Sequence, residues 1–480
     1  MTDMTRRDFM KGSLVLGTGF LAPFSYSRVL GANEEIRAAV VGINGRGRSH
    51  IRNLEDIDGV SVVALCDVDR QVLDRRAEEF KQNSNREIET YTDIRQLLER
   101  KDIDVISIAS CNHWHSLMTV WACQAGKDVY VEKPCSHNVF EGRQCVDAAR
   151  RYGRIVQHGT QSRDSASWAN MVAAAKSGKY GKLLVAKGYC CKPRWSIGQR
   201  PVETPPDHLD FDLWLGPAPQ QDYHGNLVHY NWHWFWDFGN GDMGNQGVHE
   251  MDKAYWALEP LTLPRSIVSL GGRWVNEPDF KDQAETPNML ASLFDYGDVA
   301  IVFETRGLVE NQLREQYPKM IANEYYTSEG VMKENGFYPK GKDRKEPLDD
   351  FGVTMPPGNI FGNFIHAVRS RKSEDLHADI LKGHYSSALC HLGNISYRLG
   401  EEVPWQERPE PFKSDTVSQA MVEKVLANTE ALGVDPNTAR YRLGPVLEFD
   451  PEKEDFVNHP KASQLLSREY REPFVVPKQV

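Results

Sequence analysis

Residues 36–47 read IRAAVVGINGRG, an apolar run followed directly by a glycine-rich turn. The spacing is that of the dinucleotide fingerprint G-x-G-x-x-G, with an asparagine in place of the second glycine. Glycines permit the tight turn and let backbone N–H groups approach a pyrophosphate, and asparagine tolerates glycine-like dihedral angles. Taken alone, the motif fits an ordinary strand-to-helix turn equally well. As a fingerprint, it predicts cofactor contacts from Gly42, Asn44, Gly45, Arg46 and Gly47.

A carboxylate follows at the place where such a fingerprint needs one. The next apolar run, VSVVALCDVD, reaches Asp67 roughly 20 residues beyond the turn, where an acid binds the hydroxyls of the adenosine ribose. The same acid repels a 2′-phosphate, so we expect the cofactor to be NAD. Arg70 lies nearby in the sequence and keeps NADP open as the less favoured alternative.

The wider pattern predicts an α/β protein. Apolar runs and helical stretches alternate from Ile36 to about Arg163, as in a Rossmann doubly wound parallel sheet. Beyond that point longer strand-like runs take over, and the turn Asp295-Tyr-Gly-Asp298 predicts a hairpin. We therefore expect a C-terminal α+β domain with a large, mainly antiparallel open sheet.

The expected boundaries follow the changes in pattern. They are 1–32 for an export signal, 33–163 for the NAD-binding domain, 164–400 for a substrate and oligomerisation domain, and 401–480 for a C-terminal extension that wraps a neighbouring surface. We expect an insertion at about 308–358, and a helical region from Gly358 to Leu399 that closes the second domain.

The N-terminus carries the pattern of a twin-arginine export signal. Thr5-Arg-Arg-Asp-Phe-Met-Lys11 precedes a weakly apolar run from Gly12 to Phe24, which is too short to span a bilayer. A membrane anchor or an incidental pair of arginines is the alternative. The signal predicts a periplasmic or otherwise exported protein, folded before export, with no stable membrane insertion afterwards.

Composition excludes other classes. The net charge of −10 argues against nucleic-acid binding, which needs a basic face. The eight cysteines form no C-x-x-C pair, so buried free thiols are expected instead of a disulfide framework, and no metal site is indicated.

A lysine stands at an unusual place in Val131-Glu132-Lys133-Pro134. The segment ends a predicted parallel strand, at the edge of the sheet where such folds bind ligands. The pKa of a lysine responds readily to burial, so Lys133 can hydrogen-bond a substrate hydroxyl and help to move its proton.

Several motifs together resemble the Gfo/Idh/MocA family of NAD(P)-dependent oxidoreductases, over roughly residues 36–400. They are the fingerprint, the acid at 67, Asn112-His-Trp-His115, AGKDVYVEKP, FDLWLGPAP at 211–219 and Gly247-Val-His-Glu-Met-Asp252. The resemblance implies a Rossmann domain followed by a domain whose open sheet supports the substrate and often an oligomer interface, so we expect a homodimer or homotetramer. It also implies that Lys133 and His249 lie at the reacting carbon. The cofactor side is implied to hold Asn112, His115, Glu132 and Gln161, with Arg163 near the substrate.

One position departs from the family pattern. Members often carry an aspartate four residues before the histidine, and this chain has Asn245. An amide orients a substrate but cannot raise the pKa of the histidine. We therefore expect His249, with an ordinary pKa of about 6.5, to act as the base beside Lys133, and Asp252 to orient its ring.

An aromatic run, His229-Tyr-Asn-Trp-His-Trp-Phe-Trp-Asp237, leads into this motif. Aromatic faces stack on sugar C–H groups, so the run predicts a carbohydrate-binding wall with Trp232 as a contact, although some of these rings are expected in the core. Arg194 is a further expected substrate contact.

Three functions remain open from the sequence. The favoured one is an exported, NAD-dependent oxidoreductase that acts on a secondary hydroxyl of a sugar or glycoside, with a tightly held cofactor. The alternatives are an NAD-dependent glycosidase that oxidises C3 transiently and eliminates the glycosidic bond, and a catalytically silent sugar-binding protein. Lys133 favours plain oxidoreduction, because the glycosidase relatives have another residue in the EKP motif.

Overall fold

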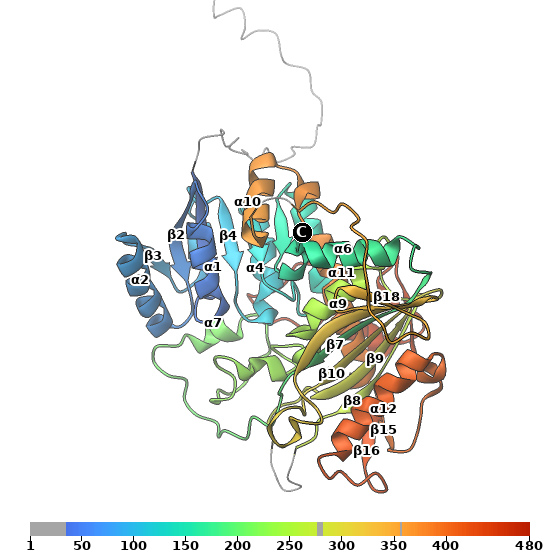
Figure 1. The fold of residues 1–480 in the computed structure, drawn as a ribbon. Helices are drawn as coiled ribbons and strands as arrows, with labels where there is room; N and C mark the ends of the chain where they lie inside the picture. The colour runs from blue at the N-terminus through green and yellow to red at the C-terminus, as the bar shows by residue number, and fades with distance from the viewer. Residues whose placement is uncertain (1–34, 276–281, 356–357) are drawn as a thin grey trace, which may run out of the picture.

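A computed structural model describes residues 35–275, 282–355 and 358–480. It places a parallel sheet beside a larger mixed sheet, each with helices against it (Figure 1). Residues 1–34, which contain the expected export signal, lie outside the described residues. Within the described ranges, no helix is both long and apolar enough to cross a membrane.

The first sheet has the order β3-β2-β1-β4-β5-β6, with every neighbouring pair parallel. Its strands are β1 (Ile36–Val41), β2 (Val60–Cys66), β3 (Glu89–Tyr91), β4 (Val105–Ile108), β5 (Asp128–Val131) and β6 (Val156–His158). The helices between them are α1 (Arg46–Glu55), α2 (Arg70–Ser84), α3 (Ile94–Leu98), α4 (Asn112–Gln124) and α5 (Val139–Arg151). Strands β4, β5 and β6 are buried at every residue, as in a sheet covered on both faces. The predicted Rossmann sheet is confirmed.

Side-chain caps fix where several of these helices begin. The carboxylates of Asp69 and Asp93 accept backbone N–H groups at the starts of α2 and α3, and the amide of Asn138 does so at α5. The caps of α2 and α3 fix the starts of those helices at the carboxyl edge of the sheet, next to the residues that follow the strands.

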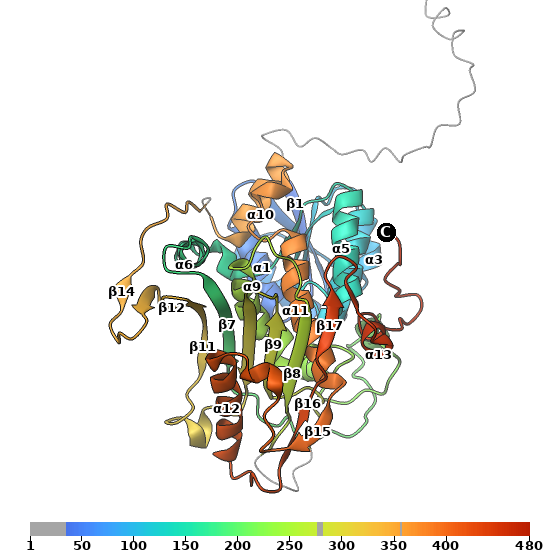
Figure 2. The ribbon, with the colours of Figure 1, turned by 90° about the vertical axis from the view of Figure 1, so that its right-hand side faces the viewer.

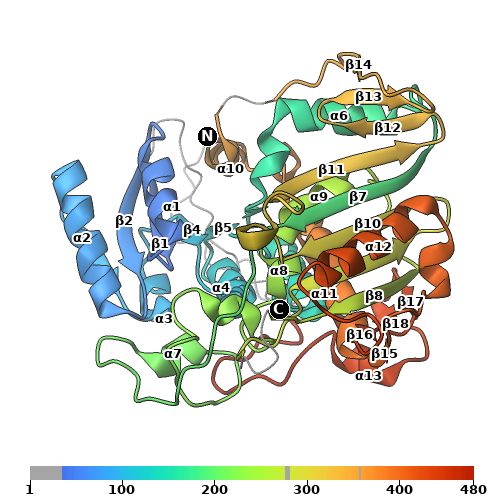
Figure 3. The same ribbon diagram turned by 60° about the horizontal axis from the view of Figure 1, so that its bottom comes forward.

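The second sheet has twelve strands and is mainly antiparallel (Figure 3). Its strands are β7 (Leu183–Cys191), β8 (Ser266–Gly272), β9 (Met289–Asp295), β10 (Ala300–Arg306), β11 (Met320–Thr327), β12 (Gly330–Lys333), β13 (Gly336–Pro339), β14 (Glu346–Pro347), β15 (Glu401–Pro404), β16 (Arg440–Leu443), β17 (Leu447–Asp450) and β18 (Asp455–Phe456). The expected hairpin is present as β9 and β10, while β10 and β7 pair in parallel. The prediction of a large, mainly antiparallel sheet is confirmed.

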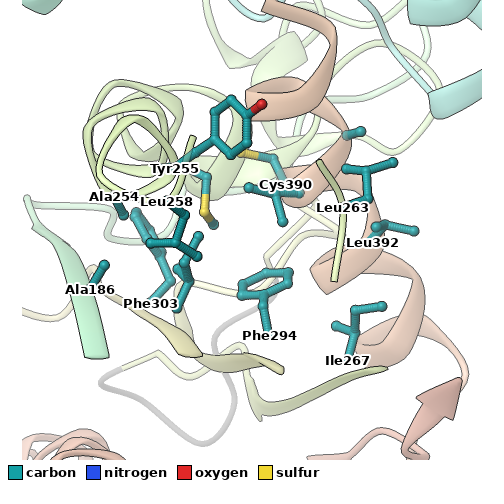
Figure 4. Close-up of a cluster of buried hydrophobic side chains, with 14 of the residues drawn as sticks. Ala186, Ala254, Tyr255, Leu258, Leu263, Ile267, Phe294, Phe303, Cys390 and Leu392 are labelled. Atoms are coloured by element: carbon teal, nitrogen blue, oxygen red, sulfur yellow. The ribbon is translucent and has the colours of Figure 1, made fainter. Parts of the chain in front are cut away.

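Helices pack on both faces of this sheet. On one face, α9 (Gly247–Trp256) and α11 (Ile380–Arg398) enclose a core in which Phe294, Phe303 and Leu392 lie together (Figure 4). On the other face, α12 (Thr416–Glu430) covers a second cluster that includes Val302 and Met421. The sheet therefore gives α9, which carries the His249 motif, a rigid support.

Short helices complete the described structure. They are η1 (Gln161–Asp164), α6 (Ala166–Lys176), α7 (Phe211–Leu215), η2 (Asn231–Trp234), α8 (Gly241–Gly244), η3 (Asn311–Leu313), α10 (Ile360–Ser370), η4 (Ser373–Asp375), η5 (Glu410–Lys413) and α13 (Pro460–Gln464).

The structure adds detail to two expectations about the second half. Residues 308–358, expected as an insertion in the second domain, contribute to its sheet, because β11 pairs with β7 along its whole length and β12 to β14 extend the sheet from there. The helices after Gly358 do not both close the second domain. Helix α10 packs its apolar face on the first domain, where Phe361 stacks on Tyr130 with ring centroids 4.3 Å apart.

The C-terminal segment 401–480 divides between the two domains. Strands β15 and β16 extend the second sheet, and β17 pairs with β8 (Figure 2). The last residues then return to the first domain, where Phe474, Val476 and Val480 join its core. Burial of apolar side chains against both domains stabilises this course of the C-terminal segment.

Candidate active site

The glycine-rich turn after β1 leaves room for a ligand only on its outer side. Gly42 has a φ of +77°, and a Cβ there would meet the backbone of Ser110. A Cβ at Gly47 would meet the carbonyl oxygen of Gly42, whereas one at Gly45 would meet nothing within 4 Å. The turn is thus closed against the sheet and open toward a cavity.

That cavity has a volume of about 580 Å³, within the usual range for small-molecule sites. Most of the predicted site residues line it: Gly42, Asn44, Gly45, Arg46, Asp67, Asn112, His115, Glu132, Lys133, Gln161, Trp232, Asn245 and His249. Gly47 lies beneath the turn and is not among the lining residues. The cavity runs from the glycine turn to the start of α9, so residues of both domains face one space.

The residues at the glycine end fit a dinucleotide. The Asp67 carboxylate accepts the backbone N–H of Ile43 at 2.8 Å and that of Asp69 at 3.1 Å, and burial raises its pKa to about 6. Ribose hydroxyls that donate to this carboxylate would favour its charged form. Asn44, Gly45 and Asp67 would therefore hold the adenosine and pyrophosphate part of NAD.

Glu132 is the centre of a hydrogen-bonded group at the other end of the cavity. It accepts from Arg46 at 2.8 Å and from Gln161 at 3.2 Å, and His50 Nε2 lies 3.2 Å from it. Burial alone would raise the pKa of Glu132, but the contact with His50 and the charges of Arg46 and Lys133 hold it well below its usual range. Arg46 thus joins the glycine turn directly to the Glu132 carboxylate.

Lys133 and Asn245 meet across the boundary between the domains. Lys133 follows β5, and its Nζ donates to the backbone carbonyl oxygen of Asn245 at 3.0 Å and lies 3.4 Å from the amide oxygen. Burial lowers the pKa of Lys133 from 10.5, with Glu132 and Asp242 opposing that shift. Asn245 therefore positions the lysine without adding a charge.

His249 lies in the first turn of α9 and presents its ring to the same cavity. Burial and the neighbouring Lys133 lower its pKa to about 3, not the ordinary value expected from the sequence. No side chain or backbone group of the described residues hydrogen-bonds this ring, and Asp252 does not orient it. The imidazole is neutral, and its nitrogens are available to a ligand.

Comparisons with known proteins identify relatives of both domains. The family model described as "Oxidoreductase family, NAD-binding Rossmann fold" matches residues 36–160, and the model "Oxidoreductase family, C-terminal alpha/beta domain" matches residues 180–267. Residues 36–160 and 180–267, which together make up less than half of the chain, thus match the two domains of the Gfo/Idh/MocA oxidoreductase family. The N-terminal domain of the chain is therefore an NAD-binding Rossmann domain.

Curated relatives of this chain carry glycosidase names. A "Glycosyl hydrolase family 109 protein" from Shewanella pealeana is 31% identical over 179 residues, which are 36% of this chain and 39% of that protein. An "Alpha-N-acetylgalactosaminidase" from Shewanella oneidensis is 30% identical over 172 residues, or 34% and 37% of the two chains. The match spans less than two fifths of these relatives.

Solved structures share the fold of this chain. The WlbA dehydrogenase from Bordetella pertussis, in complex with NADH and UDP-GlcNAcA, has a TM-score of 0.56 at 16% identity, covering 76% of this chain and 97% of that one. An NAD-binding protein from Listeria innocua has a TM-score of 0.53 at 14% identity, covering 75% and 93%.

Two predicted substrate contacts of the oxidoreductase lie elsewhere. Arg163 is buried and binds Asp252 at 2.9 Å and Glu259 at 2.9 Å. Arg194 binds Asp242 at 2.7 Å and lies over the ring of Trp234, 5.0 Å from its centroid. Neither lines the cavity. The structure therefore does not bring these two predicted substrate contacts to the cavity, because each arginine is paired with a buried carboxylate.

The remaining predicted residues of the family site have structural partners as well as cavity contact. Asn112 donates to Asn240 at 3.1 Å, and the ring nitrogens of His115 lie 2.6 Å from the carbonyl oxygen of Pro134 and 3.0 Å from that of Ser110. Trp232 stacks on His233 with centroids 3.6 Å apart. These contacts hold the cavity wall rigid around the lysine and the histidine.

Contacts between the two domains beside Asp67 could not be predicted from the sequence. Asp69 binds the rings of His208 at 3.0 Å and His229 at 3.1 Å, and the backbone N–H groups of Arg70 and Asp210 donate to His208 and Val68. We call these residues the clasp. His208 lies 139 residues from Asp69 in the chain, so no local pattern marks the contact.

Proposed function

We propose that this chain is an exported, NAD-dependent oxidoreductase that oxidises a secondary hydroxyl of a sugar or glycoside, or catalyses the reverse reaction. One observation carries the proposal: the Lys133 ammonium and the unpartnered His249 ring face the same cavity as the glycine turn. A hydroxyl between them would meet a donor and a neutral acceptor at once.

The side chains divide the work at that hydroxyl. His249, neutral at physiological pH because its pKa is about 3, accepts the hydroxyl proton as the carbon is oxidised. Lys133 donates a hydrogen bond to the same oxygen and stabilises the negative charge that develops on it. A bound NAD, held by Asn44, Gly45 and Asp67, would supply the acceptor for the hydride that leaves the carbon, so the alcohol would become a ketone.

Aromatic groups at the cavity support a sugar as the substrate. Trp232 and Tyr230 line it, and Tyr230 is 53% exposed, which leaves its ring open to the C–H face of a pyranose. The amide of Asn245 adds a polar group for a second hydroxyl.

The clasp supports a cofactor that stays bound between turnovers. It closes the adenosine end with backbone and side-chain hydrogen bonds from the second domain. Outside the cytoplasm no free NAD pool is available, so a retained cofactor must be recycled by a second substrate or within one reaction.

The second candidate is a glycosidase that works by transient oxidation at C3. It is considered because the curated relatives described above are named as glycosidases. A ketone at C3 acidifies the C2–H bond. Loss of that proton to a base expels the glycosidic oxygen, and addition of water with reduction of the ketone restores the sugar. The His233 ring lines the cavity as the candidate proton acceptor, and it is neutral because burial lowers its pKa to about 3.

Two measurements on the purified protein separate the candidates. Denaturation should release an NAD species, and a panel of sugars should change the nicotinamide absorbance of the intact protein. Phenol released from a nitrophenyl glycoside without external NAD would favour the glycosidase. A protein that releases no dinucleotide and turns over no sugar would be a sugar-binding protein and would refute both enzyme proposals.

Export is tested separately. The paired arginines Arg6 and Arg7 are the residues such a signal requires. We expect Arg6→Lys with Arg7→Lys to leave the protein in the cytoplasm of a bacterial host, as measured by cell fractionation, while the parent chain reaches the periplasm.

A further inference from the structure

A second cavity, of about 340 Å³, lies outside the site described above. It is formed where β8 ends, where α11 ends and where β16 begins, with Trp236 on one side. Tyr230 and Trp232 line the first cavity and Trp236 lines the second, so a single aromatic segment borders both. The mechanism proposed above uses none of the residues of this second cavity.

Its charged lining is mainly arginine. Arg398, Arg440 and Arg442 are exposed at their side chains, and among the described residues neither Arg398 nor Arg442 has a hydrogen-bonded or ion-paired partner. Arg440 donates a single bond, to the backbone carbonyl oxygen of Glu402 at 3.0 Å. The protein has a net charge of −10, so guanidinium groups that form no ion pair with a carboxylate among the described residues are unusual for the chain, although Glu285 and Glu402 also line this cavity.

Aromatic rings hold two of these arginines in place. The guanidinium carbon of Arg398 lies 5.1 Å from the centroid of the Trp236 ring, and that of Arg442 lies 5.7 Å from the centroid of Tyr397. Such contacts fix the guanidinium planes while leaving their N–H groups free for a ligand. Burial also lowers the pKa of Arg398, although Asp237 and Glu285 oppose the shift, so an anion would relieve an existing cost.

Arg273, in the same cavity, shows what a satisfied arginine looks like. It binds Asp282 at 2.6 Å and donates to the carbonyl oxygen of Thr286 at 3.2 Å. The difference between Arg273 and its neighbours is therefore a difference in partners and not in location.

The other lining groups suit a hydroxylated ligand. Glu285 and Glu402 offer carboxylate oxygens that accept hydrogen bonds, and Trp236 and Trp274 add aromatic surface. A planar oxyanion pairs with guanidinium groups through two parallel hydrogen bonds, as a lone hydroxyl cannot. The volume is in the range of small-molecule sites, although near its lower end.

We propose that this second cavity binds an acidic saccharide unit, with its carboxylate or sulfate group among Arg398, Arg440 and Arg442. The oxyanion is assigned by the arginines alone, and the choice of a saccharide rests on the proposed function. The site would select or anchor a charged glycan beside the catalytic cavity.

Calorimetry at low salt tests the proposal. It would measure the binding of glucuronate, glucose and inorganic sulfate to the full-length protein. We expect glucuronate to bind and glucose not to bind at this cavity. Arg398→Gln with Arg442→Gln should weaken glucuronate binding about tenfold or more, because each removes a charged hydrogen-bond donor. Lys182→Gln, which removes an exposed charge elsewhere, should change nothing.

The outcomes distinguish this proposal from the proposed function. If the double variant keeps its dinucleotide and its turnover of neutral sugars but loses glucuronate, the second site stands independently. If sulfate binds as tightly as glucuronate, the cavity is an oxyanion site without selectivity for saccharides, and the assignment of a saccharide ligand is overturned. Undiminished glucuronate binding, or a change only in oligomeric state, would overturn the site itself.

A folding defect in the double variant would not end the test. Arg442 is exposed, so Arg442→Gln alone should keep the melting temperature and still weaken binding. Arg442→Lys, which keeps the charge but not the planar fork, should recover only part of the affinity. Full recovery by lysine would refute paired recognition of an oxyanion.

Discussion

His249 and Asp252 stand one turn apart on the same helix, yet their surroundings are opposite. The His249 ring faces a cavity and has no hydrogen-bond partner among the described residues. The Asp252 carboxylate is fully buried and binds Arg163, which also binds Glu259. In the G-x-H-x-x-D motif, His249 therefore faces the cavity, whereas Asp252 has a structural role. The spacing of His249 and Asp252 along the helix does not predict this difference, because other parts of the protein cover both faces of α9.

The largest effect is expected at the lysine that shares the cavity with His249. Lys133→Met should lower kcat/KM about 10³-fold to 10⁴-fold, because the oxygen loses the donor that stabilises its charge. Steady-state kinetics would measure this, and the melting temperature should stay close to that of the parent. Lys182→Met is the matched control, since its ammonium pairs only with exposed Asp298. Equal losses in both variants would refute a catalytic role for Lys133.

Removing the ion pair between Arg163 and Asp252 should affect stability instead. Arg163→Met leaves the Asp252 carboxylate buried without its partner, so we expect the free energy of unfolding to fall by about 3–5 kcal/mol. Urea unfolding followed by fluorescence would measure it. Lys453→Met, at an exposed pair with Asp450, should change the midpoint little. A stable Arg163→Met variant with altered KM would restore Arg163 as a substrate contact.

The amide next to Lys133 allows a finer test. Asn245→Asp places a carboxylate beside Lys133 and His249, so the pKa of each should rise, because a negative neighbour favours the charged forms. Lys133 must stay protonated to stabilise the substrate oxygen, and its lowered pKa places the alkaline loss of activity below pH 10.5. In the variant that loss should move to higher pH. Asn245→Ala should not move it upward, and an unmoved profile in Asn245→Asp would contradict the assignment.

The smallest effect is expected at the clasp. His229→Ala removes one of the two rings on Asp69, while the backbone bonds of Arg70 and Asp210 remain. Release of bound NAD should become a few times faster without a change in kcat, because one surface-facing contact contributes little. Stopped-flow dilution into a dinucleotide trap would measure it. His366→Ala, a distant exposed histidine paired with Asp375, is the control.

The sequence was informative where the chemistry is local. The glycine turn, the acid at 67, the EKP lysine and the histidine of the α9 motif each follow from spacing along one strand or helix, and the structure brings them to one cavity. The two sheets also followed from strand patterns. The sequence did not reveal that Arg163 and Arg194 lie away from the cavity, because a buried carboxylate from a distant segment pairs with each of them.

Long-range pairing explains why other features could not be predicted. The polar appearance of residues 308–358 hid the fact that β11 completes the middle of a sheet through its pairing with β7. The lowered pKa of His249 depends on burial and on Lys133, neither of which is visible in the sequence around it. The clasp joins residues whose short motifs carry no signal of their own.

The return of the chain to its first domain has a consequence for biosynthesis. Helix α10 and the residues Phe474, Val476 and Val480 complete hydrophobic clusters begun by β1, β4 and β5. These residues follow both sheets in the chain, so the domain whose synthesis begins first can be completed only after the second domain has been made. Until then the apolar surface of the first domain stays uncovered and open to chaperones, and removal of Phe474, Val476 and Val480 would leave its core incomplete.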